Sequence, residues 1–204
     1  MKLKVTVIIC TRNRFDDFRS TAASLMRQNR LPDELLVVDS SDVNVLEEYL
    51  KSANLPVPVK YIHSKPGLTL QRNVGVKHST GDILFFFDDD CELDVNYLTR
   101  VEAVFLLDAK GEIGAVGGRL ENLFGNQTIT LRFRVEHAIF SLVRFVFGLS
   151  DHGNGRFRLS GMATFPHATT KEKFIECLSG GLMAFRKVVF QKAEFDENMP
   201  GYGL

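Results

Sequence analysis

The sequence lacks several features that would assign a class of protein at once. Its 204 residues include three cysteines, which are odd in number and too widely spaced for a zinc site or a disulfide framework. Lysine plus arginine and aspartate plus glutamate number 25 each, so no overall field attracts nucleic acid or an anionic membrane. No stretch of about 18 uninterrupted apolar residues could span a bilayer. These absences predict a protein of a reducing compartment, cytoplasmic and either soluble or peripheral at the cytoplasmic membrane face, with no nucleic-acid partner.

Two common nucleotide-binding fingerprints are also missing. Neither G-x-G-x-x-G nor G-x-x-x-x-G-K-[ST] occurs, so neither a nicotinamide cofactor nor an ATP P-loop is expected. Any phosphate group must therefore be bound in another way.

What the sequence does contain is a regular alternation of strand and helix patterns. At 45% apolar residues the chain can bury a sizeable core, and we expect one domain. Repeated β-α units predict an α/β fold with a mostly parallel central sheet and helices on both faces. The predicted strands are 5–10, 34–38, 59–63, 82–87 and 113–116, and the predicted helices are 16–28, 45–53, 70–78 and 95–107.

The apolar run 83–87 leads directly into Asp88, Asp89 and Asp90. Three carboxylates at the end of a buried strand repel one another unless positive charge lies among them, which predicts a bound cation. Alternation along a strand would turn Asp88 and Asp90 to one side and Asp89 to the other. Oxygen ligands of this kind suit Mg²⁺ or Mn²⁺. The alternative is a solvated acidic turn.

The other predicted strands also end in polar residues. Residues 11–14 are Thr-Arg-Asn-Arg, and residues 39–42 are Asp-Ser-Ser-Asp. Ligands of parallel sheets bind beyond the carboxyl ends of the strands, where these segments would meet the three aspartates. Such a mixed-charge crevice suits a nucleotide diphosphate that is held partly by a metal.

Four motifs carry a resemblance to a known family. They are Val7 to Arg14, Leu36 to Asp39, Gln71 to Gly75, and Gly81 to Ile83 leading to Asp88-x-Asp90. Together they resemble the nucleotide-binding part of inverting glycosyltransferases of family 2, whose fold is called GT-A. The resemblance implies a single GT-A domain over 1–204, with a nucleotide-sugar-binding half (1–118) and an acceptor-side region (119–204).

The resemblance also implies roles for individual residues. Asp39 would accept a hydrogen bond from the base, although it could instead be a turn former or a helix N-cap. Arg72 would reach the base or the diphosphate with Asn73 in support, unless both lie on an exposed helix face. The implied nucleotide-sugar-binding residues are Thr11, Arg12, Arg14, Asp39, Arg72, Asn73, Asp88 and Asp89, and the implied ligands of Mn²⁺ or Mg²⁺ are Asp90 and Asp88.

The carboxyl-terminal part of the sequence supports fewer predictions. Gly180 and Gly181 resemble an acceptor-side loop, although an ordinary turn fits equally well. Residues 185–190 predict the start of a packing helix. The family's catalytic base is an aspartate in a Glu-Asp pair, which we expect beyond Leu204. This predicts either a trimmed piece of a longer enzyme or a natural fragment that binds the donor with little turnover.

The expected partners follow from the resemblance. UDP, GDP or dTDP would carry the sugar, and a glycan, a lipid-linked group or another hydroxyl would accept it by inverting single displacement. A predicted helix over 129–149 could contact a membrane surface or a second copy of the chain, or could be an ordinary core helix. Two alternatives to a glycosyltransferase remain, a non-catalytic nucleotide-sugar-binding module and a nucleotidyltransferase on a related fold.

Overall fold

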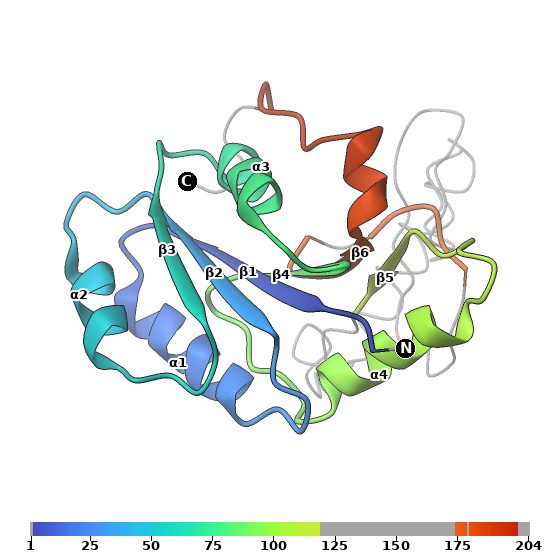
Figure 1. Cartoon of the computed structure of the whole chain (residues 1–204). Helices are drawn as coiled ribbons and strands as arrows, with labels where there is room; N and C mark the ends of the chain where they lie inside the picture. The colour runs from blue at the N-terminus through green and yellow to red at the C-terminus, as the bar shows by residue number, and fades with distance from the viewer. Residues whose placement is uncertain (1, 119–173, 179, 200–204) are drawn as a thin grey trace, which may run out of the picture. The chain divides into compact units, whose positions relative to one another are not determined.

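The computed structural model describes residues 2–118, 174–178 and 180–199, and its core is a six-stranded sheet in the order β3-β2-β1-β4-β6-β5 (Figure 1). Residues 2–117 and 180–199 belong to one compact unit. The elements are β1 (Val5–Thr11), α1 (Phe15–Met26), β2 (Glu34–Asp39), α2 (Val45–Ser52), β3 (Val59–His63), α3 (Leu68–His78), β4 (Ile83–Phe87), α4 (Tyr97–Leu107), β5 (Ala115–Gly117), β6 (Leu182–Arg186) and the 3₁₀-helix η2 (Lys187–Gln191).

The sheet is parallel from β3 to β4 and is covered on both sides. β1 and β4 are buried along their whole length, as expected when helices cover both faces of a sheet. α3 and η2 lie on one face, and α1 and α4 lie on the other (Figure 1). The predicted mostly parallel α/β fold is therefore confirmed.

Phenylalanines on both sides of β4 anchor these layers. The Phe86 ring packs within 5.3 to 5.9 Å, centroid to centroid, of Phe185, Phe190 and Phe195. Phe85 and Phe87 point to the other face and contact Tyr97 of α4. The alternation of β4 side chains thus joins a carboxyl-terminal segment to one face of the sheet and α4 to the other.

The helix α3 lies unusually close to β1. A Cβ atom added at Gly75 would lie 2.5 Å from Cγ2 of Ile8, so only glycine permits this approach. The contact brings the first turns of α3 over the carboxyl ends of the central strands.

The strand β6 was not predicted. Residues 182–186 pair antiparallel with β4 on one side and with β5 on the other. The prediction that a helix begins at Phe185 is wrong, because Phe185 and Arg186 belong to this strand and η2 begins at Lys187. The predicted helix over 129–149 lies outside the described residues.

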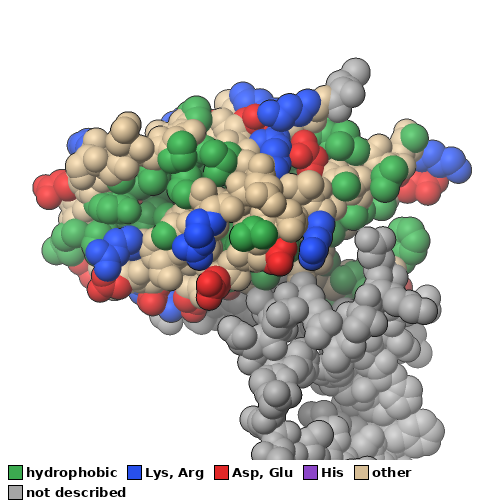
Figure 2. Space-filling view, turned by 90° about the horizontal axis from the view of Figure 1, so that it is seen from below, with side chains coloured by type: hydrophobic (Ala, Val, Ile, Leu, Met, Phe, Trp, Pro, Cys, Tyr) green, Lys and Arg blue, Asp and Glu red, His purple; other side chains and the backbone are tan. Residues whose placement is uncertain are grey.

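The described surface has no dominant charge on the face seen in Figure 2. Basic, acidic and apolar side chains are interspersed there, in line with the balanced composition. Within the described ranges, no helix is both long enough and apolar enough to cross a membrane.

Candidate functional site

The carboxyl ends of β1, β2 and β4 form one edge, as the sequence predicted. Thr11 is paired with Asp39 in the β1–β2 register, and β4 lies on the other side of β1. The buried Gln71 in α3 donates from Nε2 to the carbonyls of Thr11 (3.0 Å) and Val38 (2.8 Å). This amide ties α3 to the strand ends and so fixes the position of its neighbour Arg72. Sequence reasoning quoted Gln71 only as part of a motif.

Asp89 is the buried member of the three aspartates. Its carboxylate accepts hydrogen bonds from Oγ1 of Thr11 and Nη1 of Arg14, both at 2.7 Å. Its carbonyl accepts one from Oγ1 of Thr21 at 2.8 Å. Burial raises the pKa of the Asp89 carboxyl, although Thr11 and Arg14 oppose the rise.

Arg14 bridges three carboxylates. Besides Asp89, its Nη2 lies 3.0 Å from Oδ2 of Asp90, and its Nε lies 3.0 Å from Oδ2 of Asp17. Asp89 and Asp90 therefore share a partner, which differs from the predicted alternation. The reason is that β4 ends at Phe87, so Asp89 and Asp90 lie in a turn rather than in a pleated strand.

Asp88 has a different cation, Arg72. Nη2 of Arg72 lies 3.1 Å from Oδ1 of Asp88 and 2.9 Å from the carbonyl oxygen of Gly180. Arg72 is 6% exposed, so this guanidinium is fixed by its partners. Burial raises the pKa of the Asp88 carboxyl, with Arg72 opposing. Arg14 and Arg72 thus supply part of the positive charge that three adjacent aspartates require.

The two predicted acceptor-side glycines lie directly against this pair. The Gly181 carbonyl accepts the Asp88 N–H at 3.2 Å. A Cβ atom at Gly181 would lie 3.1 Å from Oδ2 of Asp88, closer than most side chains allow. Gly180 and Gly181 therefore form part of the wall beside Asp88.

Asn73 faces a different segment. Its Nδ2 donates to the carbonyl of Phe195 (2.9 Å) and to Oε1 of Glu197 (2.8 Å), and its Oδ1 accepts the Phe195 N–H (3.0 Å). The structure thus brings Asn73 to residues 195–197 rather than to the ends of β1 and β2.

Asp39 is fully buried and accepts hydrogen bonds on both carboxylate oxygens. Its Oδ1 accepts from N–H (2.8 Å) and Oγ (2.6 Å) of Ser41, and its Oδ2 accepts from the Tyr61 hydroxyl at 3.1 Å. Burial, and then the Asp39 charge, raise the pKa of Tyr61, so its proton stays on the phenol. Tyr61 was missed in the sequence, where it is one of several alternating residues in a strand.

A groove lies beside Asp39 at the ends of β2 and β3. It encloses about 730 Å³ and is lined by residues 40–44, Glu47 and residues 63–66. Arg12 lies near its rim, with Nη2 3.8 Å from Oδ1 of Asp42. The Nε of Arg12 is buried without a hydrogen-bond partner among the described residues.

The aspartates retain capacity for a metal. Oδ2 of Asp88 and Oδ1 of Asp90 accept no hydrogen bond from any described residue. Within the described part of the chain, no three acidic, histidine or cysteine side chains converge on one point. Two carboxylates with free oxygens nevertheless fit Mg²⁺ or Mn²⁺, since such ions are commonly held by one or two carboxylates together with substrate phosphates.

A comparison with known families decides the affiliation. Residues 6–192 match the family model described as Glycosyl transferase family 2. The chain belongs to this family. A relative from Bacillus subtilis, "Uncharacterized glycosyltransferase YwdF", is 30% identical over 88 residues, covering 43% of this chain and 33% of that protein. "Inactive polypeptide N-acetylgalactosaminyltransferase-like protein 5" of Macaca fascicularis is 24% identical over 97% of this family 2 chain and 44% of its own length.

The fold also agrees with that of a solved structure. "Mannosyltransferase PcManGT from Pyrobaculum calidifontis in complex with GDP-Man and Mn2+" superposes with a TM-score of 0.62 at 17% identity, over 97% of this chain and 49% of that one. The predicted GT-A fold is confirmed. This family 2 chain spans less than half the length of each of these three proteins.

Proposed function

We propose that this chain binds a nucleotide diphosphate sugar and forms the donor side of a metal-dependent, inverting glycosyltransferase. The observation that carries the proposal is the arrangement at one sheet edge of a buried acceptor, Asp39, and two arginine-paired aspartates, Asp88 and Asp90, each with one oxygen that no described residue bonds. The family affiliation supports it.

The nucleobase of the donor would be recognised by Asp39. A carboxylate only accepts hydrogen bonds, so Asp39 selects a ring N–H, which uracil, thymine and guanine offer at the pyrimidine or purine edge. This favours UDP, dTDP or GDP as the carrier. Thr11 would line the same pocket while holding Asp89. Arg12, whose Nε has no hydrogen-bond partner in the described part of the chain, would face the nucleotide.

The diphosphate would lie between the arginines and the aspartates. Asp90 and Asp88 would hold Mn²⁺ or Mg²⁺, which when bound neutralises charge that develops on the leaving diphosphate. Arg14 and Arg72 keep these carboxylates in place through bonds of 3.0 and 3.1 Å. Gly180 and Gly181 would leave room for the sugar or acceptor beside Asp88.

An inverting transfer also needs a carboxylate that deprotonates the acceptor hydroxyl on the far side of the sugar. We assign this base to none of the described acids near the site. Oδ1 of Asp196 accepts from the backbone and amide N–H groups of Asn198, and Glu197 accepts from Asn73. Both have structural partners.

The test is a calorimetric panel of UDP, GDP and dTDP, with and without Mn²⁺. We expect one of them to bind in the presence of Mn²⁺, and Asp90→Ala to weaken that binding at least tenfold, about 1.4 kcal/mol. Asp16→Ala is the matched control, because the Asp16 side chain is 86% exposed and forms an ion pair with Arg19. Binding that ignores both the metal and Asp90→Ala would overturn the proposal.

A nucleotide-sugar-binding module without turnover is a second candidate. It is favoured because Asp196 and Glu197 already accept hydrogen bonds from Asn198 and Asn73, and because one relative is named inactive. Release of free nucleotide diphosphate from the bound sugar donor distinguishes the two: turnover supports the enzyme, and tight binding without release supports the module.

A further inference from the structure

The side-chain amide of Asn73 forms two hydrogen bonds with the backbone of Phe195, as a neighbouring strand would. This amide accepts the Phe195 N–H at 3.0 Å and donates to the carbonyl of the same residue at 2.9 Å. Phe195 itself lies in no helix or strand. Both backbone polar groups of Phe195 are therefore satisfied by one side chain of α3.

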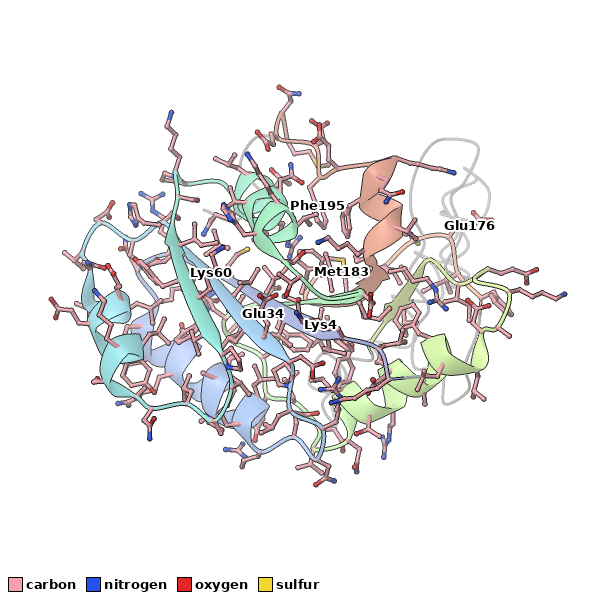
Figure 3. The ribbon with its side chains drawn as sticks, viewed as in Figure 1. Lys4, Glu34, Lys60, Glu176, Met183 and Phe195 are labelled. Carbon is pink, nitrogen blue, oxygen red and sulfur yellow. The ribbon has the colours of Figure 1, made fainter. Side chains whose placement is uncertain are left out.

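The Phe195 ring is held separately. It packs against Phe86 with a centroid distance of 5.3 Å and against Phe190 at 5.6 Å. Figure 3 labels Phe195, which lies between α3 and η2. On its other side, the guanidinium carbon of Arg72 lies 5.6 Å from the ring centroid, within range of a cation–π contact. Backbone and ring thus fix Phe195 beside Arg72.

Arg72 connects this contact to the donor site. The same guanidinium bonds to Asp88 at 3.1 Å and to the Gly180 carbonyl at 2.9 Å. A ligand that draws Arg72 toward or away from Asp88 must also change its contact with the Phe195 ring. The segment 195–199 and the donor site therefore share one cation.

We propose that Asn73 is a positioning residue that clamps segment 195–199 beside Arg72, so that nucleotide binding at Arg72 and Asp88 and the placement of this segment strengthen each other. The coupling rests on the proposed nucleotide site, whereas the clamp itself does not. Coupling between two such events is reciprocal: the factor by which nucleotide stabilises the clamped segment equals the factor by which the clamp tightens nucleotide binding.

The clamp is tested by amide hydrogen exchange at Phe195, measured by NMR without ligand. Asn73→Ala should raise the exchange rate at least tenfold. Asn73→Asp leaves no cavity and should also raise the exchange rate. The new carboxylate cannot donate to the Phe195 carbonyl or to Glu197, and it is repelled by both. Asn29→Ala is the control, since the exposed amide of Asn29 donates to Asn96 and its loss should leave Phe195 protected. Unchanged exchange in both Asn73 variants would overturn the clamp.

The coupling is tested by adding whichever of UDP, GDP or dTDP binds, with Mn²⁺. We expect the nucleotide to slow Phe195 exchange several-fold in the wild type and to have no effect in Asn73→Asp, whose nucleotide Kd should rise by the same factor. A purely structural role for Asn73 would leave the Kd unchanged, which would overturn the coupling. If no nucleotide binds the wild type, the proposed function and the coupling both fail, and the clamp is still judged from exchange without ligand.

Discussion

The pKa values of carboxyl groups are shifted in opposite directions at the two ends of the parallel strands. At the amino ends, the pKa values of Asp33 and Glu34 are lowered: burial would raise them, but hydrogen bonds from Arg30 and Thr6, among others, outweigh it. At the carboxyl ends, burial prevails and raises the pKa values of Asp88 and Asp89.

The number of donors explains the difference. Asp33 accepts from Arg30 at 2.7 Å, from the Val5 N–H at 2.8 Å and from Lys2 at 3.3 Å. Asp88 has one strong side-chain donor, Arg72. An acid with enough donors is stabilised as an ion by the fold, whereas an acid with too few is stabilised by a further cation. We therefore interpret the amino-end acids as structural and the carboxyl-end acids as a site for a ligand.

The largest effect is expected from a substitution at the amino ends of the strands. Asp33→Ala leaves Arg30, whose side chain is 14% exposed, without its carboxylate partner at 2.7 Å. The Asp33 side chain is 27% exposed and Glu102 remains 3.0 Å from Arg30, so losing this partly buried pair should lower the free energy of unfolding by about 2 kcal/mol, measured by urea denaturation. Nucleotide binding at 25 °C should be unchanged. A loss no larger than that of the exposed control Asp16→Ala would contradict a structural role for this cluster.

The second prediction concerns neutralisation of an acid at the carboxyl ends of the strands. Asp88→Asn keeps the shape and an acceptor for Arg72 but removes a poorly solvated charge, so the free energy of unfolding should change by less than about 1 kcal/mol. Mn²⁺-dependent nucleotide binding should weaken about tenfold, which corresponds to 1.4 kcal/mol. Calorimetry and urea denaturation of one preparation measure both. Strong destabilisation with intact binding would reverse the assignment of the two ends.

The smallest effect is the pH dependence of stability. At Asp33 and Glu34 the folded pKa is lowered, so their contribution is present above the unfolded value of about 4 and is lost as pH falls through the folded pKa. At Asp88 and Asp89 the folded pKa is raised, so stability increases as pH falls through the folded pKa toward the unfolded one.

Denaturation at a series of pH values should therefore separate the two ends. Asp89→Asn should remove part of the gain in stability on mild acidification toward pH 4, and Asp33→Ala should remove part of the loss at lower pH. Parallel curves for wild type and both variants would show that the two ends do not differ.

The sequence predicted the parallel part of this architecture because its signals are local. Runs such as 5–10 and 83–87 and the helix between Leu68 and His78 are marked by their own periodicity and by the turns that follow. β6 was missed because five residues of mixed character become a strand only through pairing with β4 and β5, which are distant in the sequence.

The candidate site was predictable to a similar extent. The segments at the strand ends could be named, because a parallel sheet brings them together. Which arginine pairs with which aspartate could not, since Arg14 and Arg72 reach the aspartates from different elements. The bonds from Asn73 to Phe195 span 122 positions of the sequence, and nothing local to either residue indicates them.

The place of β6 in the sheet has a consequence for the order in which the protein is made. β4 and β5 both take their antiparallel partner from residues 182–186, so neither has that partner while the ribosome has released only the first 117 residues. The nascent chain can close the pairs β3-β2-β1-β4, but the outer edge of the aromatic strand β4 stays open to other strands until much later in synthesis. Chaperone demand and aggregation during translation should therefore peak before β6 emerges and fall once it is inserted.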